Sequence, residues 1–468
     1  MDHRNCTGGF KCSDIKNAIK KQVEFNLIIL GSGESGTGAA LLAKQRGISV
    51  FVSDRGLIPE KYKIELQQHH IPFEEGQHSE DLILDAQQII KSPGIPEKAD
   101  IMKKIRAKGI SVISEIEFAF RYKGESKILC ITGSNGKTTT TSLAYYIFEK
   151  AGYDVSVVGN IGNSFARQIV VKPTEWYVME ISSFQLDDIQ SFRPDIAVIM
   201  NITPDHLDRY DYDFAKYTQA KFNITKYQEE DDYLILCKDD TTIQQFLHDN
   251  PINSKTLFFT MNEQLKGDGA FLNQNELVIK VNGEPFSISI NELSLKGKHN
   301  QYNSMAAGIS ARVAEIRDAS IRECLKTFTA IEHRMESVAT IRGIEFINDS
   351  KATNLNSVWY ALESMTKPTI LILGGIDKGN DYNEIRDLVN EKVKTIVCLG
   401  MDNTPIHTFF DGMIEIVDTN RIEDAVRAAY SLAETGDCVL LSPACASFDL
   451  FKNYEDRGEQ FKSTVKAL

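Results

Sequence analysis

A nine-residue segment, Gly133–Thr141, gathers two glycines, a lysine and four threonines into one short stretch. It follows the apolar run Ile128–Ile131, which predicts a buried strand, and it precedes Ser142–Phe148, whose apolar periodicity predicts a helix. A strand, a glycine-rich turn and a helix N-terminus point several backbone N–H groups at one anion. Lys137 adds a positive charge for a terminal phosphate, and Thr138 adds a hydroxyl for Mg²⁺. The pattern therefore predicts a loop that binds a nucleoside triphosphate.

The spacing of this loop differs from the general phosphate-binding loop. That loop has a glycine five residues before the Gly-Lys pair. Ile131 stands at that position here, and the upstream glycine is Gly133, three residues before Gly136. We therefore expect a tighter loop than the one in GTPases or common ATPases.

A second glycine-rich segment, Gly31–Gly36, follows the predicted strand Phe25–Leu30. Asp54 comes after the next predicted strand, Ser49–Ser53, so that an acid follows the glycines by about 20 residues. This order is typical of dinucleotide-binding folds. Because nothing downstream suggests hydride chemistry, we favour a nucleotide diphosphate over NAD or FAD at this loop.

Polar residues follow two further strands in the middle of the chain. Glu180 comes directly after Trp176–Met179, and His206 lies in the loop that follows Ile196–Met200. Ligands of parallel sheets gather at the carboxyl ends of the strands. Glu180 is therefore a candidate ligand of a magnesium ion bound with the triphosphate. His206 shares its loop with Asp205 and Asp208 and is a candidate site residue.

The last third of the chain repeats this arrangement three times. Asn348–Asn354, Gly374–Gly379 and Ser442–Asp449 each follow a predicted strand. Arg334, which opens this region, suits bidentate binding of phosphate. Three polar loops at strand ends predict a second ligand site.

Strands alternate with helices along most of the chain, which predicts an α/β protein of three domains, each with a mostly parallel sheet flanked by helices. The first and last domains are expected to be Rossmann-like, and the central one to be a phosphate-loop ATPase. Short alternating runs between Lys255 and Leu295 predict an antiparallel insert. The predicted boundaries are a polar extension or tag at 1–22 and domains at 23–124, 125–331 and 332–468.

Charge and composition limit the classes of molecule that this chain is expected to bind. The chain has 468 residues and a formal net charge of −13, which argues against a nucleic-acid partner. No run of 18 apolar residues occurs, so no membrane span is expected, and the polar N-terminus does not resemble a signal peptide. The eight cysteines include no C-x-x-C pair, so we expect reduced thiols and neither a disulfide framework nor a zinc site.

The chain carries an ordered set of short motifs. They are T-G-S-N-G-K-T, G-N-I-G, E-I-S-S-F-Q-L, N-I-T-P-D-H-L-D-R, G-K-H-N-x-x-N, E-H-R, N-D-S-K-A-T-N, G-G-I-D-K-G, S-P-A-C-A-S-F-D and F-K-N-Y-E-x-R-G. Taken together, they resemble the Mur ligase family, which shares its loop form T-G-S-N-G-K-T with folylpolyglutamate synthetases. The resemblance covers about residues 25–468. The segments N-D-S-K-A-T-N and S-P-A-C-A-S-F-D point to the D-glutamate-adding member, and the D-N-P-R motif of the meso-diaminopimelate-adding member is absent.

The resemblance implies an ATP-dependent, Mg²⁺-dependent ligase that joins D-glutamate to UDP-N-acetylmuramoyl-L-alanine through an acyl phosphate. It implies a cytoplasmic monomer that makes peptidoglycan precursors. Its implied catalytic residues are Lys137, Glu180, His206 and Lys221, of which Glu180, His206 and a carbamylated Lys221 join Thr138 as metal ligands. The implied ATP-binding residues are Gly133, Asn135, Gly136, Lys137, Thr138, Thr139, Asn300, Asn303, Arg334 and Asp349.

The two remaining substrate sites also follow from the resemblance. The UDP-substrate residues implied are Glu34, Ser35, Asp54, Arg55, Gly94, Asn160, Ser182 and Gln185. The D-glutamate residues implied are Lys351, Thr353, Lys378, Ser447, Phe448 and Tyr454. Glu34 departs from the expected pattern, because a carboxylate there must avoid the substrate diphosphate. Phe448 and Tyr454 stand where some family members have leucine and phenylalanine.

Other classes of protein remain possible from the residues alone. A phosphate-loop switch or kinase would need no amino-acid site, and an NAD enzyme or regulatory module would use only the first domain. Within the ligases, another Mur ligase or a folylpolyglutamate synthetase is the main alternative.

Overall fold

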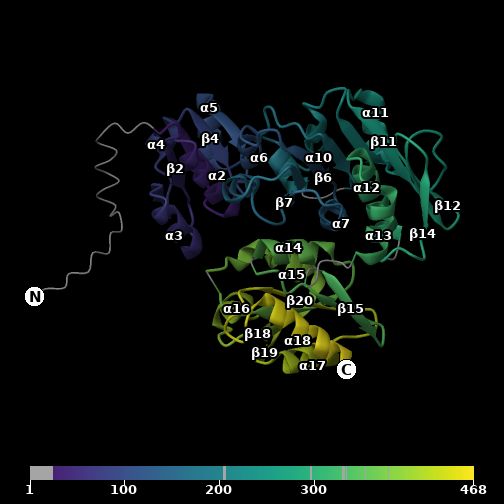
Figure 1. Ribbon diagram of the computed structural model, residues 1–468. Helices are drawn as coiled ribbons and strands as arrows, with labels where there is room; N and C mark the ends of the chain where they lie inside the picture. The colour runs from purple at the N-terminus through teal and green to yellow at the C-terminus, as the bar shows by residue number, and fades with distance from the viewer. Residues whose placement is uncertain are drawn as a thin grey trace, which may run out of the picture. The chain divides into compact units, whose positions relative to one another are not determined.

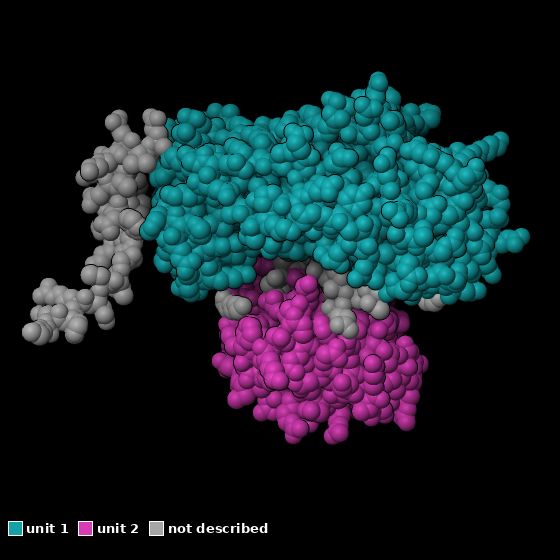
Figure 2. Space-filling model, viewed as in Figure 1, with its two compact units in different colours: residues 1–328 teal, residues 329–468 magenta. Residues whose placement is uncertain are grey.

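The computed structural model describes residues 25–203, 207–295, 298–328, 333, 335–353, 355–377 and 379–468. The chain forms two compact units, residues 1–328 and 329–468, coloured teal and magenta in Figure 2. The described residues contain no helix that is both long and apolar enough to cross a membrane.

The first sheet is wholly parallel, with strand order β3-β2-β1-β4-β5. Helices cover both faces of this sheet, so its strands are buried. This explains why a strand such as Leu27–Leu30 is wholly apolar. The elements are β1 (Leu27–Leu30), α2 (Glu34–Gln45), β2 (Val50–Ser53), α3 (Glu60–Gln68), β3 (Phe73–Glu74), α4 (Glu80–Leu84), β4 (Gln88–Lys91), α5 (Asp100–Lys108), β5 (Ser111–Ser114) and α6 (Glu115–Phe120).

The second sheet has nine strands in the order β14-β13-β12-β11-β10-β9-β6-β8-β7. Its strands are β6 (Lys127–Thr132), β7 (Val155–Gly159), β8 (Trp176–Glu180), β9 (Ile196–Ile199), β10 (Tyr233–Cys237), β11 (Lys255–Thr260), β12 (Gly269–Asn273), β13 (Glu276–Lys280) and β14 (Phe286–Ser289). Its helices are α7 (Lys137–Lys150), α8 (Phe165–Val171), α9 (Ser183–Leu186), η1 (Leu207–Tyr210), α10 (Phe214–Phe222), η2 (Asn223–Thr225), α11 (Thr241–Asp249), α12 (Lys298–Val313) and α13 (Asp318–Thr327).

The predicted antiparallel insert is partly wrong. β11 pairs in parallel with β10, and β12 pairs in parallel with β11, so the parallel sheet continues past Lys255. Only the β12–β13 and β13–β14 pairs are antiparallel, and they extend the same sheet. Strand alternation in the sequence cannot distinguish a separate insert from an edge extension, because the side-chain period is two in both.

The third sheet has the order β15-β16-β20-β17-β18-β19 and is parallel except for the β15–β16 pair. Its elements are β15 (Glu336–Ile341), β16 (Ile344–Asn348), α14 (Leu355–Ser364), β17 (Thr369–Gly374), η3 (Tyr382–Glu384), α15 (Arg386–Lys392), β18 (Val393–Leu399), α16 (Thr404–Phe410), β19 (Glu415–Thr419), α17 (Ile422–Leu432), β20 (Cys438–Ala444) and α18 (Tyr454–Lys466). Three mostly parallel sheets flanked by helices (Figure 1) confirm the predicted fold class.

Successive residues of β17 enter different cores of this sheet. Leu371 and Leu373 pack into one apolar cluster, whereas Ile370 and Ile372 pack into another. Because neighbouring side chains of a strand point to opposite faces, both faces of the sheet are buried. This burial explains why the sequence of β17 reads as a continuous apolar run.

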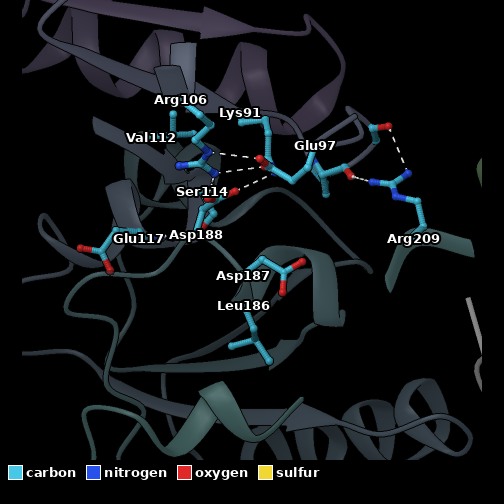
Figure 3. A network of polar contacts seen from close by, with 12 residues as sticks. Lys91, Glu97, Arg106, Val112, Ser114, Glu117, Leu186, Asp187, Asp188 and Arg209 are labelled. Atoms are coloured by element: carbon cyan, nitrogen blue, oxygen red, sulfur yellow. Dashed lines mark hydrogen bonds and ion pairs between the residues drawn. The ribbon is translucent and has the colours of Figure 1, made fainter. Parts of the chain in front are cut away.

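The first two sheets belong to one unit, and a polar network joins them (Figure 3). Lys91 at the end of β4 lies 2.8 Å from Asp188 of the second sheet's domain, and Arg106 lies 2.5 Å from the same carboxylate. The buried Glu117 accepts hydrogen bonds from the backbone N–H groups of residues 190, 191 and 192. One apolar core also runs through both domains. Their carboxyl strand ends are therefore held in a fixed relation.

Candidate active site

The glycine-rich loop after β6 has the conformation of an anion-binding turn. Gly133 and Gly136 have φ angles of 149° and 85°, and Gly136 is the residue immediately before α7. A side chain at Gly133 would lie 2.9 Å from Met200 Cβ, so only glycine fits there. The Lys137 ammonium donates hydrogen bonds to the carbonyls of Gly133, at 3.0 Å, and Ser134, at 2.8 Å. The loop thus places a lysine and a helix N-terminus together, as predicted.

Thr138 and Glu180 meet at the carboxyl ends of two paired strands. β6 and β8 are parallel neighbours, with Ile131 opposite Glu180. The Thr138 hydroxyl donates to Glu180 Oε2 at 2.7 Å, and Glu180 is buried. A hydroxyl oxygen and a buried carboxylate beside a phosphate-type loop are the oxygen donors that Mg²⁺ takes with nucleotide phosphates. The donor set therefore fits the predicted magnesium ion.

Lys221 reaches the same loop from α10. Its side chain is 2% exposed, and its Nζ donates to the Gly133 carbonyl at 2.8 Å. It also lies over the Tyr217 ring, 4.7 Å from the centroid. A lysine that sequence alone would place on an ordinary helix surface is thus a buried part of the loop's surroundings.

The loop is held by residues that the sequence prediction missed. Asn201 accepts a hydrogen bond from the Asn135 N–H and donates to the Asn135 carbonyl. Ser134 Oγ lies 3.0 Å from the Tyr217 hydroxyl and pairs with the backbone of Thr203. Asn201 and Thr203 belong to the predicted loop N-I-T-P-D-H-L-D-R, which was the available signal. Nothing in the sequence indicated a role for Tyr217 except its position one helical turn before Lys221.

Asn300 and Asn303 lie near this loop on α12. Asn303 is buried, its Oδ1 accepts from the Thr140 hydroxyl at 3.2 Å, and its Nδ2 donates to Asn300 Oδ1 at 3.0 Å. A side chain added at Gly136 would lie 2.6 Å from Asn303 Oδ1. Asn303 therefore packs on the phosphate-type loop itself, and Asn300 lies next to it.

Three predicted substrate residues follow β7 and β8. Asn160 donates its backbone N–H to the Glu180 carbonyl, while its buried side-chain Nδ2 has no hydrogen-bond partner among the described residues. Such a buried donor is costly unless a ligand or water completes it. Ser182 and Gln185 form a capping box at the start of α9, with Gln185 Oε1 accepting from the Ser182 N–H at 3.0 Å. Their local role is helix capping.

The first glycine-rich loop is organised by Asp54. Its Oδ2 accepts hydrogen bonds from both the N–H and the hydroxyl of Ser32 at 2.7 Å, and its Oδ1 accepts from the Gly56 N–H. Arg55 and Gly94 are exposed, and Ser35 is half-buried in the first turn of α2. Arg209 donates to the carbonyls of Pro93, at 2.9 Å, and Gly94, at 3.4 Å, which ties the segment after β4 to the second domain (Figure 3).

The Glu34 carboxylate is hydrogen-bonded to other groups of the protein. Its Oε1 accepts from the Ser164 N–H at 3.0 Å and from Arg167 Nε at 2.7 Å, and its Oε2 accepts from the Tyr62 hydroxyl at 3.4 Å. Arg167 also pairs with Glu65. The carboxylate that departs from the expected sequence pattern is therefore engaged by α3 and by the start of α8.

A buried arginine organises the strand ends of the third sheet. Arg457 is 1% exposed and donates to the Ser350 hydroxyl and carbonyl and to the Cys445 carbonyl. Burial lowers the pKa of its guanidinium to about 10. Asp349 is buried between the Met335 N–H and the Ser442 hydroxyl. Arg457 lies in the motif F-K-N-Y-E-x-R-G, but the sequence prediction gave it no role.

The described residues predicted to bind D-glutamate lie on the loops after β16 and β20, except for Tyr454, which begins α18. Lys351 is exposed, and its Nζ lies 5.9 Å from the Tyr454 ring centroid. Ser447 is buried, whereas Phe448 is 67% exposed. Thr353 is half-buried beside Lys351. Because Arg457 joins the Ser350 and Cys445 backbones, the two loops have a fixed spacing.

Three further predicted residues, His206, Arg334 and Lys378, lie outside the described part of the chain, as does the 1–22 extension.

Comparison with known proteins identifies the family. Family models match residues 25–114 (Mur ligase MurD-like, N-terminal domain), 131–311 (Mur ligase middle domain) and 333–445 (Mur ligase, glutamate ligase domain). The chain belongs to the Mur ligase family. The predicted family resemblance is therefore confirmed.

Relatives and solved structures agree with this membership. UDP-N-acetylmuramoylalanine–D-glutamate ligase of Bacteroides thetaiotaomicron is 54% identical over 94% of this chain and 99% of its own length. The protein of the same name from Porphyromonas gingivalis is 50% identical over 96% and 100%. A murein peptide ligase from Psychrobacter arcticus is 16% identical with a TM-score of 0.51, covers 94% of this chain and 99% of its own, and supports the fold alone.

Proposed function

We propose that this Mur ligase is an ATP-dependent ligase that adds D-glutamate to UDP-N-acetylmuramoyl-L-alanine. The relatives that carry this activity in their names are 40–54% identical to the chain over nearly its whole length. The single structural observation that supports it best is the Thr138–Glu180 pair, 2.7 Å apart, beside the Lys137 loop. That pair can hold the magnesium of a bound ATP.

The chemistry begins with a carboxylate that is a poor electrophile. An oxygen of the L-alanine carboxylate attacks the γ-phosphorus of ATP, and the bond to ADP breaks. Lys137 and the N–H groups at the start of α7 neutralise the transferred phosphoryl group. Magnesium, when bound by Thr138 and Glu180, adds positive charge at the phosphate oxygens.

Amide formation follows from the acyl phosphate. The D-glutamate amine attacks the carbonyl carbon, the tetrahedral intermediate expels inorganic phosphate, and the amine nitrogen loses its proton. The unpaired Asn160 Nδ2 is a donor suited to an oxygen of the muramoyl-alanine end. The loops around Lys351, Thr353 and Ser447, braced by Arg457, are the proposed D-glutamate site, with Lys378, Phe448 and Tyr454 expected from the motifs.

Lys221 is proposed to act as a carbamate. Addition of CO₂ to its neutral amine forms an N–C bond and releases a proton, which replaces a cation with an anionic oxygen donor. An ammonium would repel Mg²⁺ at this position, whereas a carbamate can ligate it. The buried Nζ, 2.8 Å from the Gly133 carbonyl, lies close enough to the loop for this role. Full activity of Lys221→Ala in the absence of added short carboxylic acids would contradict it.

The cellular setting completes the proposal. Uridine-linked muramoyl precursors are small anionic molecules, and we propose that the chain acts on them in the cytoplasm, as a monomer. Its net charge of −13 argues against a nucleic-acid partner.

Isotope transfer tests the acyl phosphate. UDP-N-acetylmuramoyl-L-alanine labelled with ¹⁸O in its carboxylate is incubated with ATP, Mg²⁺ and D-glutamate. One ¹⁸O is expected in each phosphate released, because the carboxylate oxygen leaves with phosphorus. Product formation with unlabelled phosphate would contradict the mechanism.

A further inference from the structure

A cysteine, a histidine and an aspartate meet at the edge of the third sheet, outside the predicted site. Cys398 of β18 is directly opposite Asp418 of β19 in the parallel register, so both side chains lie on one face. His407 comes from α16, whose Ile406 and Phe410 are buried in the same core as Cys398. One donor atom of each residue, a thiol sulfur, a ring nitrogen and a carboxylate oxygen, lies within 4.8 Å of the other two.

Carboxylates face both nitrogens of the His407 ring. His407 Nδ1 lies 3.1 Å from Asp411 Oδ1, and His407 Nε2 faces Asp418 Oδ2 at 2.9 Å. An ion between His407 and Asp418 would replace the proton on Nε2, while Nδ1 keeps donating to Asp411. A carboxylate behind a ligating histidine is the usual outer partner of a metal-bound imidazole. The Asn403 amide donates to Asp418 Oδ1 at 2.9 Å, which orients the second ligand.

A further polar atom near the cluster lacks a partner. The side-chain oxygen of Asn403 is buried and has no hydrogen-bond partner among the described residues. Its own amide nitrogen is the group that donates to Asp418. The oxygen itself lies 3.0 Å from where a side chain on Gly400 would begin, so it is not counted among the proposed ligands.

We propose that Cys398, His407 and Asp418 form a zinc site. Thiolate, imidazole and carboxylate are the ligands that Zn²⁺ takes in tetrahedral sites, with bonds of about 2.0–2.3 Å. Donor atoms around such an ion are roughly 3.3–3.8 Å apart. The longest separation, at most 4.8 Å, must therefore close by about 1 Å, while the 2.9 Å between His407 Nε2 and Asp418 Oδ2 must open slightly to admit the ion. Asp418 is an exposed side chain on the last strand of the sheet and can make that movement.

Zinc bound here would stabilise the fold of this unit. The ion would join α16 to β18 and β19, and a water molecule would take the fourth position. The three proposed ligands belong to the second compact unit, whereas Thr138 and Glu180 belong to the first. The ligands are nine and eleven residues apart in sequence, so no spacing rule for zinc motifs could have found them.

Cobalt substitution tests the proposal on the full-length protein. Metal-free protein is titrated with Co²⁺ in the presence of excess Mg²⁺, and thiolate-to-cobalt charge transfer is followed in the near ultraviolet. We expect one equivalent of Co²⁺ to produce this band, one equivalent of Zn²⁺ to abolish it, and Zn²⁺ to raise the melting temperature.

Variants assign the ligands. Cys398→Ser should lose the band, and His407→Gln should bind Zn²⁺ at least roughly 100-fold more weakly. Asp411→Asn should weaken binding by about 10- to 100-fold. Matched controls are Cys438→Ser, a buried cysteine of the same sheet, and His248→Gln, an exposed histidine paired with Asp249.

Three results would overturn the site. They are a wild-type protein without the thiolate band at micromolar Co²⁺, a band that persists in Cys398→Ser, and equal thermal stabilisation of wild type and His407→Gln by Zn²⁺. If Cys398→Ser does not fold, the partly exposed His407 still decides the matter through its own variant.

Discussion

Arg167 offers a sharp test of how the chain accommodates Glu34. The Arg167 side chain pairs with Glu34 at 2.7 Å and with Glu65, and it is only 13% exposed. Glu34 is the first residue of α2 and lies in the glycine-rich segment Gly31–Gly36, where the sequence predicts a nucleotide diphosphate. Arg167→Ala removes the cation that holds this carboxylate against the second domain. We expect the freed carboxylate to repel the UDP-substrate.

The size of the effect follows from Coulomb's law. A carboxylate about 6 Å from one phosphate charge contributes roughly 0.7 to 3 kcal/mol at an effective dielectric constant between about 80 and 20. At 1.4 kcal/mol for each tenfold change, that is a rise of roughly 3- to 100-fold in the KM for the UDP-substrate. The KM for ATP should change little, because Tyr62, Ser164 and Glu65, which contact this pair, lie outside the Gly133–Thr141 loop. Salt should reduce the effect, because the charges are partly exposed.

Steady-state phosphate release measures these constants. Glu34→Gln in the Arg167→Ala background should restore most of the lost affinity, because the amide is neutral. Arg193→Ala is the control, since it removes a half-buried arginine paired with Asp232 in the same unit. An unchanged KM in Arg167→Ala, or no rescue by Glu34→Gln, would refute the assignment.

Three further outcomes are expected. Glu180→Gln should lower kcat at least about 100-fold at saturating ATP while leaving the melting temperature near that of the wild type, measured by phosphate release and by thermal unfolding; near wild-type turnover would exclude Glu180 as a metal ligand. Burial raises the pKa of the Glu115 carboxyl to about 8. The stability contributed by its protonated form is therefore fully present below about pH 4.5, the pKa of an unfolded glutamate. That stability is lost, by up to about 1.4 kcal/mol per pH unit, as pH rises towards 8. Glu115→Gln should therefore gain stability relative to wild type across that window in urea titrations, and a pH-independent difference would contradict this. Arg457→Met leaves two buried carbonyls without donors, which costs about 2–6 kcal/mol of stability. It should also raise the KM for D-glutamate but not for ATP. An unchanged midpoint of urea unfolding would show that the Arg457 hydrogen bonds are dispensable.

The sequence predicted the parts of the site that follow from short-range geometry. A strand, glycines and a lysine in order dictate an anion-binding turn, and Gly133 and Gly136 adopt the positive φ angles that such a turn needs. Glu180 could be placed because it follows a buried strand, and ligands gather at that edge of a parallel sheet. These inferences need only local periodicity and the direction of the strands.

Residues that depend on packing between distant segments were not predicted. Arg457 contacts Ser350, 107 residues away, and only the folded sheet brings their helix and loop together. Arg167 and Glu34 are separated by 133 residues. Tyr217 supports the phosphate-type loop through one hydroxyl, although its sequence position suggests an ordinary core aromatic. No periodicity reports such pairings, because they are set by the order of strands and by helix packing.

The choice of amino acid tests the central proposal most directly. Initial rates of phosphate release are measured with ATP, Mg²⁺ and UDP-N-acetylmuramoyl-L-alanine for D-glutamate, L-glutamate, L-lysine and meso-diaminopimelate. The account predicts a kcat/KM for D-glutamate at least about 100-fold above the other three. L-Lysine lacks the second carboxylate, meso-diaminopimelate is longer and carries a second amino group, and L-glutamate cannot place its amine and both carboxylates at the positions that D-glutamate occupies. Efficient turnover of L-lysine or meso-diaminopimelate, or no turnover of D-glutamate, would contradict it.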